Sequence, residues 1–314
     1  MIDAELVGAL PRSVLARREL RPLRFKLGLD RDGRDAYLRT VGQNVRFYEV
    51  AAQILDEAER RGLGLLPFKG ALLGALYGDL GTRPMADLDL IARPGELDAI
   101  AAMMGALGFR RQYRGRARFS ERHGHDVAFA GEANLAVDVH WRLFHELAGD
   151  ASVGEIFARA IEVELDGRKR AAPSWDDHLW AVAVHAATHA FGDSPLWILD
   201  VAVLLERGAS VERAGEEAER RRVGAAFRAA MAIAHAALPS RIPEAACRPG
   251  DRVRKRLLGV VLGDALARAP ARLPSLVARA VVTDDPRDAI REVLRKAELR
   301  AVELGEWLRR SRAR

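Results

Sequence analysis

The sequence predicts a protein of the α+β or α/β class, in which a small mixed β-sheet with flanking helices is followed by a mostly helical C-terminal domain. Two observations support this prediction. Between residues 63 and 144, short apolar segments separated by turn residues are typical of strands. From residue 174 onward, apolar residues recur almost entirely at helical intervals. We therefore expect an N-terminal helical extension over residues 1–34, a sheet-containing core over 35–172 and a helical domain over 173–314.

The composition indicates a soluble protein. With 314 residues and 49% hydrophobic content, the chain is long enough for two domains with sizeable cores. The one cysteine, Cys247, excludes an intramolecular disulfide and a cysteine-based zinc cluster. The start of the chain lacks the pattern of a signal peptide, and no apolar run approaches the ~20 residues of a membrane span. We expect a cytoplasmic location without membrane insertion.

Basic residues exceed acidic residues by 50 to 44, which gives a formal net charge of +6. Nearly all the basic residues are arginine, which indicates either the base composition of the genome or a polyanion-binding surface. Extended nucleic-acid binding would favour exposed aromatics among the basic residues, and aromatics make up only 6% of the chain. A nucleotide would require only a local basic pocket.

The first helices are predicted from spacing and from stop signals. Residues 14–21 form a candidate basic helix that ends before Pro22. Residues 35–62 place apolar side chains at helical intervals, and Gly62 is suited to end that helix.

Strands and helices then alternate. Residues 63–68 are predicted as a buried strand that turns into a helix over 71–77, although Pro67 cannot donate a ladder hydrogen bond. A loop over 78–86 leads to a strand over 87–92. Pro94 suits the first turn of a helix over 95–107, which Gly108 ends. Further strands are predicted over residues 109–113, 126–130 and 135–144, with a turn at 131–134, and a further hairpin over 161–171.

The helical half begins at Ser174, which suits an N-cap position followed by Asp176 and Asp177. The arginine-rich end, residues 291–314, is expected to be an ordinary helix with a solvated basic face; the alternative is a surface for a membrane or an acidic partner. Cys247 is interpreted as structural. Helices are predicted over residues 175–191, 196–207, 211–237, 252–268, 273–281 and 286–310.

Three aspartates are the leading candidates for a metal site. Asp87 and Asp89 alternate with leucines, so both carboxylates lie on one face of a strand. Same-face positions lie ~6.5 to 7 Å apart, which suits ions held ~3.5 to 4 Å apart. Asp138 repeats the pattern on a later strand, where it could help hold Mg²⁺ against a triphosphate or act as a general base. Asp126 is a rival for the role of base.

A basic turn precedes the paired aspartates. Gly70 would let a phosphate approach the backbone, and the following helix would present its amide groups. Lys69 and Arg83 could each neutralise a phosphate in a charge-assisted contact. The alternative is that both are solvated surface charges.

Together these residues resemble the uncharacterised bacterial nucleotidyltransferases of the DNA polymerase beta-like superfamily, and the resemblance covers residues 40–206. It implies a nucleotidyltransferase core that uses Mg²⁺, as a pair of ions, to transfer a nucleoside monophosphate from a nucleoside triphosphate such as ATP. The stretches that carry it are Phe68-Lys69-Gly70-Ala71-Leu72, Arg83-Pro84-Met85-Ala86-Asp87-Leu88-Asp89-Leu90, Val137-Asp138-Val139-His140-Trp141, Asp177-His178-Leu179, His185, His189 and Leu199-Asp200-Val201.

By this resemblance Gly70 takes the first turn position, Asp87 and Asp89 are the paired metal ligands, and Asp138 is the third carboxylate. Ala71 departs from the glycine or serine of the pattern and offers a phosphate only its backbone amide. The departure motivates a second hypothesis, a catalytically weak nucleotide-binding or regulatory protein with the same fold. The acceptor is left open among a small molecule, a protein, a sugar and RNA.

Glycosyltransferases also use an Asp-x-Asp pair to bind a sugar nucleotide through a metal. In them the pair usually follows a nucleotide-binding parallel sheet. The order of elements predicted here does not supply such a sheet before Asp87, which disfavours that class.

Three histidines are candidates for the surroundings of the site. His140 shares a strand face with Asp138 and could orient an acid, touch substrate or simply be a satisfied histidine. His185 and His189 lie four residues apart and share a helix face. The zinc-protease pattern requires a glutamate directly after the first histidine, and Ala186 stands there. We expect this pair to face the catalytic cleft or a polar contact between domains.

Overall fold

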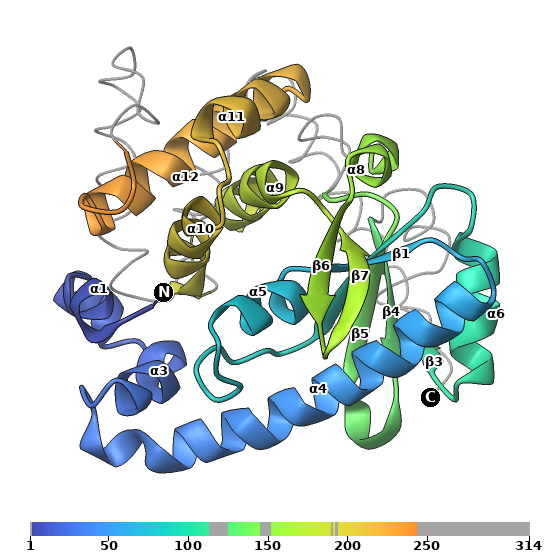
Figure 1. Cartoon of the computed structure of the whole chain (residues 1–314), viewed down its shortest axis with the longest axis horizontal. Coiled ribbons are helices and arrows are strands. Elements are labelled where there is room, and N and C mark those ends of the chain that lie inside the picture. The colour runs from blue at the N-terminus through green and yellow to red at the C-terminus, as the bar shows by residue number, and fades with distance from the viewer. Residues whose placement is uncertain (1, 113–124, 145–151, 190, 192–193, 244–314) are drawn as a thin grey trace, which may run out of the picture.

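The structure, a computed structural model, describes residues 2–112, 125–144, 152–189, 191 and 194–243. Its centre is a five-stranded mixed sheet in the order β1-β2-β5-β4-β3 (Figure 1). Among the described strand pairs of this sheet, β2 and β5 are parallel and the others are antiparallel. The mixed sheet predicted from the sequence is therefore confirmed. The strands are β1 (Leu65–Phe68), β2 (Leu88–Ala92), β3 (Arg110–Gln112), β4 (Asp126–Ala130) and β5 (Ala136–His140).

The prediction of one helix over residues 14–21 in the N-terminal segment is wrong. This segment contains α1 (Ala4–Gly8), α2 (Arg12–Leu15) and α3 (Arg21–Lys26). Arg17 is extended, with φ −66° and ψ 137°, and interrupts the helical path after α2. Pro22 does not stop a helix but lies in the first turn of α3, where a missing amide breaks no helical hydrogen bond.

The long helix α4 (Arg34–Arg60) confirms the prediction over residues 35–62 and runs along the lower edge of the view in Figure 1. Its polar side chains hold the loop that leads to β2. Asn44 Nδ2 donates hydrogen bonds to the carbonyl oxygens of Leu80 and Arg83, at 2.7 and 2.8 Å. Gln43 Nε2 donates to the Met85 carbonyl at 2.9 Å. The loop that brings Arg83 and Asp87 to the sheet is therefore fixed on α4.

The two faces of the sheet pack against different parts of the molecule. Apolar residues of β2 and β5 on one face share a core with α4 and with α6 (Leu97–Ala106); they are Leu88, Leu90, Val137 and Val139. On the opposite face, Phe68 and Ile91 share a core with the helical half of the chain. Burial of both faces explains why these short strands are so apolar.

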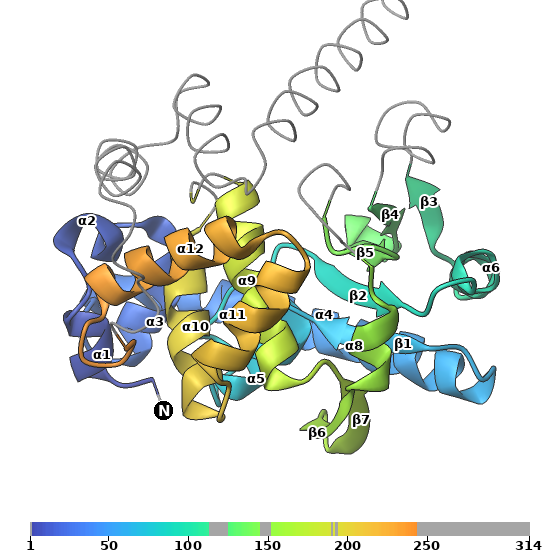
Figure 2. The same ribbon diagram turned by 90° about the horizontal axis from the view of Figure 1, so that it is seen from above.

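The second half of the described chain is largely helical, as the sequence predicted. A hairpin of β6 (Ile161–Leu165) and β7 (Arg168–Ala172) forms a separate sheet and precedes this half, which lies beside the main sheet in Figure 2. Ser174 Oγ caps the first of its helices by accepting from the Asp177 amide, as expected. The helices are α9 (Trp175–Thr188), α10 (Leu196–Glu206), α11 (Val211–Arg220) and α12 (Gly224–Ala237).

The prediction of a single helix over residues 211–237 is wrong. Arg222 has φ of 59°, a left-handed conformation that ends α11 and lets the chain reverse before α12. Both α11 and α12 pack against α9. A single straight helix over the same residues could not place both of its halves on α9. The predicted helices over 252–268, 273–281 and 286–310, as well as Cys247, lie outside the described residues. Within the described parts, no helix combines the length and apolar character of a membrane span.

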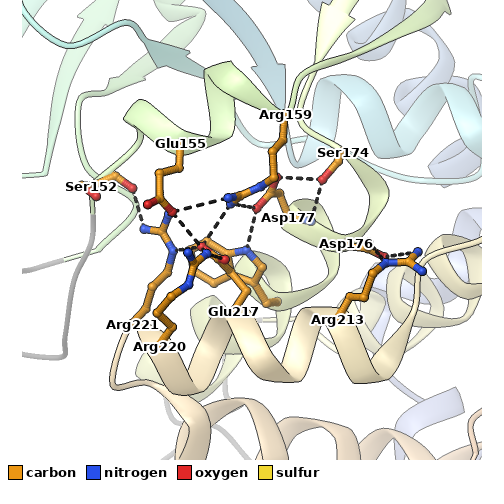
Figure 3. A network of polar contacts seen from close by, with 11 residues as sticks. Ser152, Glu155, Arg159, Ser174, Asp176, Asp177, Arg213, Glu217, Arg220 and Arg221 are labelled. Carbon is orange, nitrogen blue, oxygen red and sulfur yellow. Dashed lines mark hydrogen bonds and ion pairs between the residues drawn. The ribbon is translucent and has the colours of Figure 1, made fainter.

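A network of arginines and carboxylates ties the sheet-containing part to the helical half (Figure 3). The network includes residues on and next to α8 (Gly154–Ala158), a short helix that was not predicted from the sequence. Arg159, directly after α8, donates to both oxygens of Asp177 on α9, at 2.7 and 3.0 Å, and to Glu217 on α11 at 3.1 Å. Arg221 pairs with Glu217 and donates to the Ser152 carbonyl.

Candidate active site

The three predicted aspartates come together on the sheet face that is directed toward the helical half. In the parallel pairing of β2 with β5, Asp89 lies directly beside Asp138. Neighbouring residues of paired strands share a face, and His140, two residues after Asp138, lies on it as well. Asp87 immediately precedes β2. The alternation recognised in the sequence thus places the carboxylates as expected, with the leucines on the other face.

Asp89 is the most strongly engaged of the three. Its Oδ1 lies 3.0 Å from Lys69 Nζ and 2.7 Å from His140 Nε2. Burial by itself raises the pKa of the Asp89 carboxyl, but the charge of Lys69 and the hydrogen bond from His140 outweigh it and hold that pKa well below the ordinary value. Asp89 is therefore a carboxylate at all physiological pH values.

Asp87 has the opposite character. Burial, together with the negative charges of Asp89 and Asp138, raises the pKa of Asp87 to about 6. The positive charge of Lys69 opposes this effect only in part. The carboxylates are thus close enough to repel one another.

The chemical type of these side chains, three carboxylates, suits a divalent cation. Mg²⁺ prefers carboxylate oxygens, and a cation among Asp87, Asp89 and Asp138 would relieve the repulsion that raises the pKa of Asp87. In their present positions, however, no three His, Cys, Asp or Glu side chains among the described residues are arranged to hold one ion. Lys69 occupies an oxygen of Asp89 instead. A metal held by all three aspartates would therefore require their side chains to move from these positions.

Lys69 and Gly70 form the turn between β1 and α5 (Gly70–Leu76), as predicted. Lys69 has φ of 40° and ψ of −115°, a conformation that costs a non-glycine residue about 1–3 kcal/mol. Gly70 is buried and closely surrounded: a Cβ there would lie 3.1 Å from Met85 Cγ and 3.4 Å from Arg83 Nη1. The turn is therefore strained, tightly packed and directly beside the Arg83 guanidinium.

Arg83 is not a solvated surface charge. Its Nε and Nη2 donate to the two carboxylate oxygens of Asp200 on α10, both at 2.8 Å. Tyr77 also donates to Asp200 Oδ1, at 2.8 Å. Since Nη1 lies beside Gly70, this buried pair holds one edge of the guanidinium against the basic turn. A contact between Arg83 and a phosphate remains a prediction.

The side chain of Ala71 lies away from the site. It is fully buried in the core formed with α4. A serine at this position would place its hydroxyl in that core and not on the sheet face that carries the aspartates. Ala71 thus packs in the core and can offer a phosphate only its backbone amide.

His185 on α9 and His189, the C-cap residue of that helix, differ in burial. The rings of His185 and His189 lie 4.4 Å apart between centroids, so they share a helix face as predicted. His185 is partly buried, and His189 is exposed. Burial, aided by the charge of Lys69, lowers the pKa of His185 well below its ordinary value. Because His185 also interacts with the charge of Asp89, it belongs to the surroundings of the carboxylates.

Sequence reasoning missed the roles of His178 and Asp200. His178 Nε2 accepts a hydrogen bond from the Lys69 amide at 3.1 Å, and Asp200 binds Arg83. Both residues stand in helices more than 100 positions away along the chain. The signal was a polar residue amid apolar neighbours, as in Leu199-Asp200-Val201, but nothing local identified the partner.

The fold and the site together define a nucleotidyltransferase. A mixed sheet carries two alternating aspartates on one strand and a third on the parallel neighbour, beside a basic glycine turn. Residues 27–239 match the family model described as "Uncharacterised nucleotidyltransferase". Since this match covers more than half of the chain, the protein belongs to that family.

Several solved structures are similar at low identity. The solution structure of the antibiotic-resistance factor ANT(2'')-Ia is 17% identical and aligns over 60% of this chain and 95% of its own, with a TM-score of 0.41. The lincosamide antibiotic adenylyltransferase LnuA, bound to lincomycin, is 15% identical over 49% of this chain and 94% of its own, with a TM-score of 0.36. An antigenic nucleotidyltransferase-like protein from Paracoccidioides brasiliensis is 13% identical over 64% and 95%, with a TM-score of 0.37. No curated protein matches the sequence.

Proposed function

We propose that this protein transfers a nucleoside monophosphate from a nucleoside triphosphate, with ATP as the first candidate, to the hydroxyl group of an acceptor in a reaction that depends on Mg²⁺. The observation that carries the proposal is the gathering of Asp87, Asp89 and Asp138 on one sheet face beside the Lys69-Gly70 turn. Since nucleoside triphosphates and Mg²⁺ are abundant in the cytoplasm, we propose that the protein works there.

Asp87, Asp89 and Asp138 would hold the metal, as a pair of ions. When bound, Mg²⁺ would offset the negative charge of the triphosphate and of the attacking oxygen. Lys69 would leave Asp89 and bind the phosphates, next to Gly70, which allows close approach of the backbone. Arg83 would direct the edge of its guanidinium that lies beside Gly70 toward the same phosphates.

In the transfer itself, the acceptor oxygen would form a bond to the α-phosphorus. The bond from that phosphorus to the bridging oxygen of the β-phosphate would break, and pyrophosphate would leave with the bonding electrons. Asp138 would take the proton of the acceptor hydroxyl. His140, which donates to Asp89 Oδ1, would keep that carboxylate in place, and His185 and His189 would line the space for nucleotide or acceptor.

The test follows label from each of the four nucleoside triphosphates, labelled at the α-phosphate, into the small-molecule, protein and RNA fractions of a cell extract. We expect incorporation that requires Mg²⁺ and releases pyrophosphate. Asp138→Asn should lower it about 100-fold or more, since removal of a general base has that effect. Asp126→Asn, the matched control, should keep most activity. Label transfer that persists in Asp89→Asn would refute the proposal.

The alternative of a catalytically weak binding protein arose from Ala71. The buried Ala71 side chain leaves only the backbone amide for a phosphate, which is the basis of this alternative. Tight binding of nucleotide and Mg²⁺ without pyrophosphate release in any fraction would favour it.

A further inference from the structure

The conformation of Lys69 requires support from outside the turn. With φ of 40° and ψ of −115°, Lys69 lies in a region of backbone space that L-residues rarely adopt. Such a conformation persists only where the surroundings hold it. The residue at the strained position is lysine and not glycine, so the conformation has a steric cost.

The support comes from His178 on α9. Its Nε2 accepts the hydrogen bond of the Lys69 amide at 3.1 Å, and its ring packs on Phe68 with centroids 5.0 Å apart. The His178 side chain has no solvent exposure. Because Nε2 accepts, the neutral ring must carry its proton on Nδ1. This hydrogen bond joins the helical half to the backbone of the basic turn.

The conformation held in this way determines where the Lys69 side chain points. Its Nζ reaches Asp89 Oδ1 at 3.0 Å, across the β1–β2 pair in which Phe68 opposes Asp89. A more ordinary backbone at Lys69 would direct the side chain elsewhere and would move Gly70 relative to Met85 and Arg83. The cation and the glycine of the proposed phosphate site therefore depend on the same backbone angle.

We propose that His178 is a positioning residue for the phosphate site: by accepting the Lys69 amide hydrogen, it holds the Lys69-Gly70 turn in the conformation that binds the triphosphate. This proposal rests on the function proposed above, because the turn is the site where we place the phosphates. His178 does not touch substrate in it and acts through the backbone of Lys69.

The charge state of His178 agrees with this role. Burial, together with the positive charges of Arg83 and Lys69, lowers the pKa of His178 to about 3. The ring is thus neutral at physiological pH and keeps a lone pair on Nε2. The negative charges of Asp89 and Asp177 oppose this lowering but do not outweigh it.

The experiment compares two substitutions of similar size in the full chain. His178→Gln keeps an acceptor near the position of Nε2, whereas His178→Met has a chain of similar length without a strong acceptor. For each variant, circular dichroism reports folding, and calorimetry measures binding of Mg²⁺ with the α,β-methylene analogue of the triphosphate that the wild type binds best. Nitrogen-15 spectra of the wild type identify the tautomer of His178, and hydrogen exchange reports protection of the Lys69 amide.

We expect His178→Met to fold, to lose protection of the Lys69 amide and to bind the analogue about tenfold more weakly, as expected for loss of one buried hydrogen bond. His178→Gln should restore protection and bind within about threefold of the wild type. The spectrum should identify the Nδ1–H tautomer.

Equal affinity of the wild type and a folded His178→Met would overturn the positioning role while leaving the proposed function intact. So would an Nε2–H tautomer, or a loss of affinity in His178→Gln equal to that in His178→Met. Absence of binding by the wild type for all four analogues would instead refute the proposed function, and the positioning role with it.

Discussion

Lys69 and Asp89 form an ion pair of 3.0 Å within the proposed catalytic site. The ammonium group lies on the same carboxylate oxygen to which His140 donates. The site thus pairs the buried carboxylate of Asp89 with a side-chain cation. A metal ion bound by Asp89 would compete with Lys69, and a triphosphate would give Lys69 another partner.

This competition predicts opposite effects of Lys69→Met on two ligands. Mn²⁺ alone should bind about three- to tenfold more tightly, because a competing charge close to Asp89 is removed. The triphosphate analogue with Mg²⁺ should bind about tenfold more weakly. Free Mn²⁺ measured by electron paramagnetic resonance, and calorimetry with the analogue, check both. Lys169→Met, at an exposed lysine of β7, should change neither; weaker binding of Mn²⁺ alone to Lys69→Met would contradict the competition.

Asp87→Asn should stabilise the protein in the presence of a chelator. The folded pKa of Asp87, about 6, lies above the ordinary value of 3.8, so the folded state holds the proton more tightly than the unfolded state does. Ionisation at pH 7 therefore destabilises the fold, by about 3 kcal/mol, and asparagine avoids this. The gain in the free energy of unfolding, measured in urea, should shrink as the pH falls from 7 to about 4.

Asp32→Asn at an exposed position is the control for this change and should shift the free energy of unfolding by less than about 0.5 kcal/mol. A loss of stability in Asp87→Asn at pH 7 would show that the other carboxylates do not crowd Asp87.

Substitutions at Arg83 and Asp200 should have strongly non-additive effects on the free energy of unfolding. Asp200→Asn removes one partner and leaves a largely buried arginine charge, which should cost about 3–5 kcal/mol of unfolding free energy. The double variant Arg83→Met with Asp200→Asn should lose less than the sum of the single losses, because no charge is left without its partner. Urea unfolding of the four proteins measures the coupling. Additive losses would mean that the pair contributes no interaction of its own.

Asp177 should make stability depend on acidic pH. Burial raises the pKa of this carboxyl, but hydrogen bonds from Arg159, Ser174 and Trp180 outweigh it and hold the pKa below its ordinary value. The unfolded state therefore binds the proton more tightly, so this contribution is present above the ordinary pKa and is lost as the pH falls through the lower folded value.

Asp177→Asn should consequently lose about 1–2 kcal/mol near neutral pH and show a shallower decline of unfolding free energy on acidification below about pH 4. Unfolding in urea at several pH values checks this, with Glu162→Gln on β6 as an exposed control. A decline as steep as that of the wild type would assign the acid sensitivity to other carboxylates.

The parts of the site that follow from local pattern were predictable from the sequence. Alternation of Asp87 and Asp89 with leucines sets their common face, and the Lys69-Gly70 turn follows from an apolar strand that is followed by lysine and glycine. Both patterns depend only on the two-residue period of a strand and on residues adjacent in the chain. The mixed sheet and the helical half follow from the same periods.

What the sequence did not reveal depends on contacts between distant segments. The left-handed residue at the break is Arg222 itself, two residues before Gly224, and both α11 and α12 pack on α9. Likewise, the partner of Arg83 is chosen by the packing of α10, and the acceptor of the Lys69 amide by the packing of α9. The local sequence around Arg83 does not show whether its side chain faces solvent or a buried aspartate.

The central claim is that Asp87, Asp89 and Asp138 hold divalent metal against a triphosphate lying on the Lys69-Gly70 turn. A crystal structure of the protein with Mn²⁺ and a non-hydrolysable triphosphate tests it most directly, because anomalous scattering locates the metal. We predict Mn²⁺ peaks within about 2.3 Å of oxygens of these aspartates, with Lys69 Nζ moved from Asp89 to the phosphates. Nucleotide bound elsewhere, or these carboxylates still paired with Lys69 and His140 without metal, would contradict the claim.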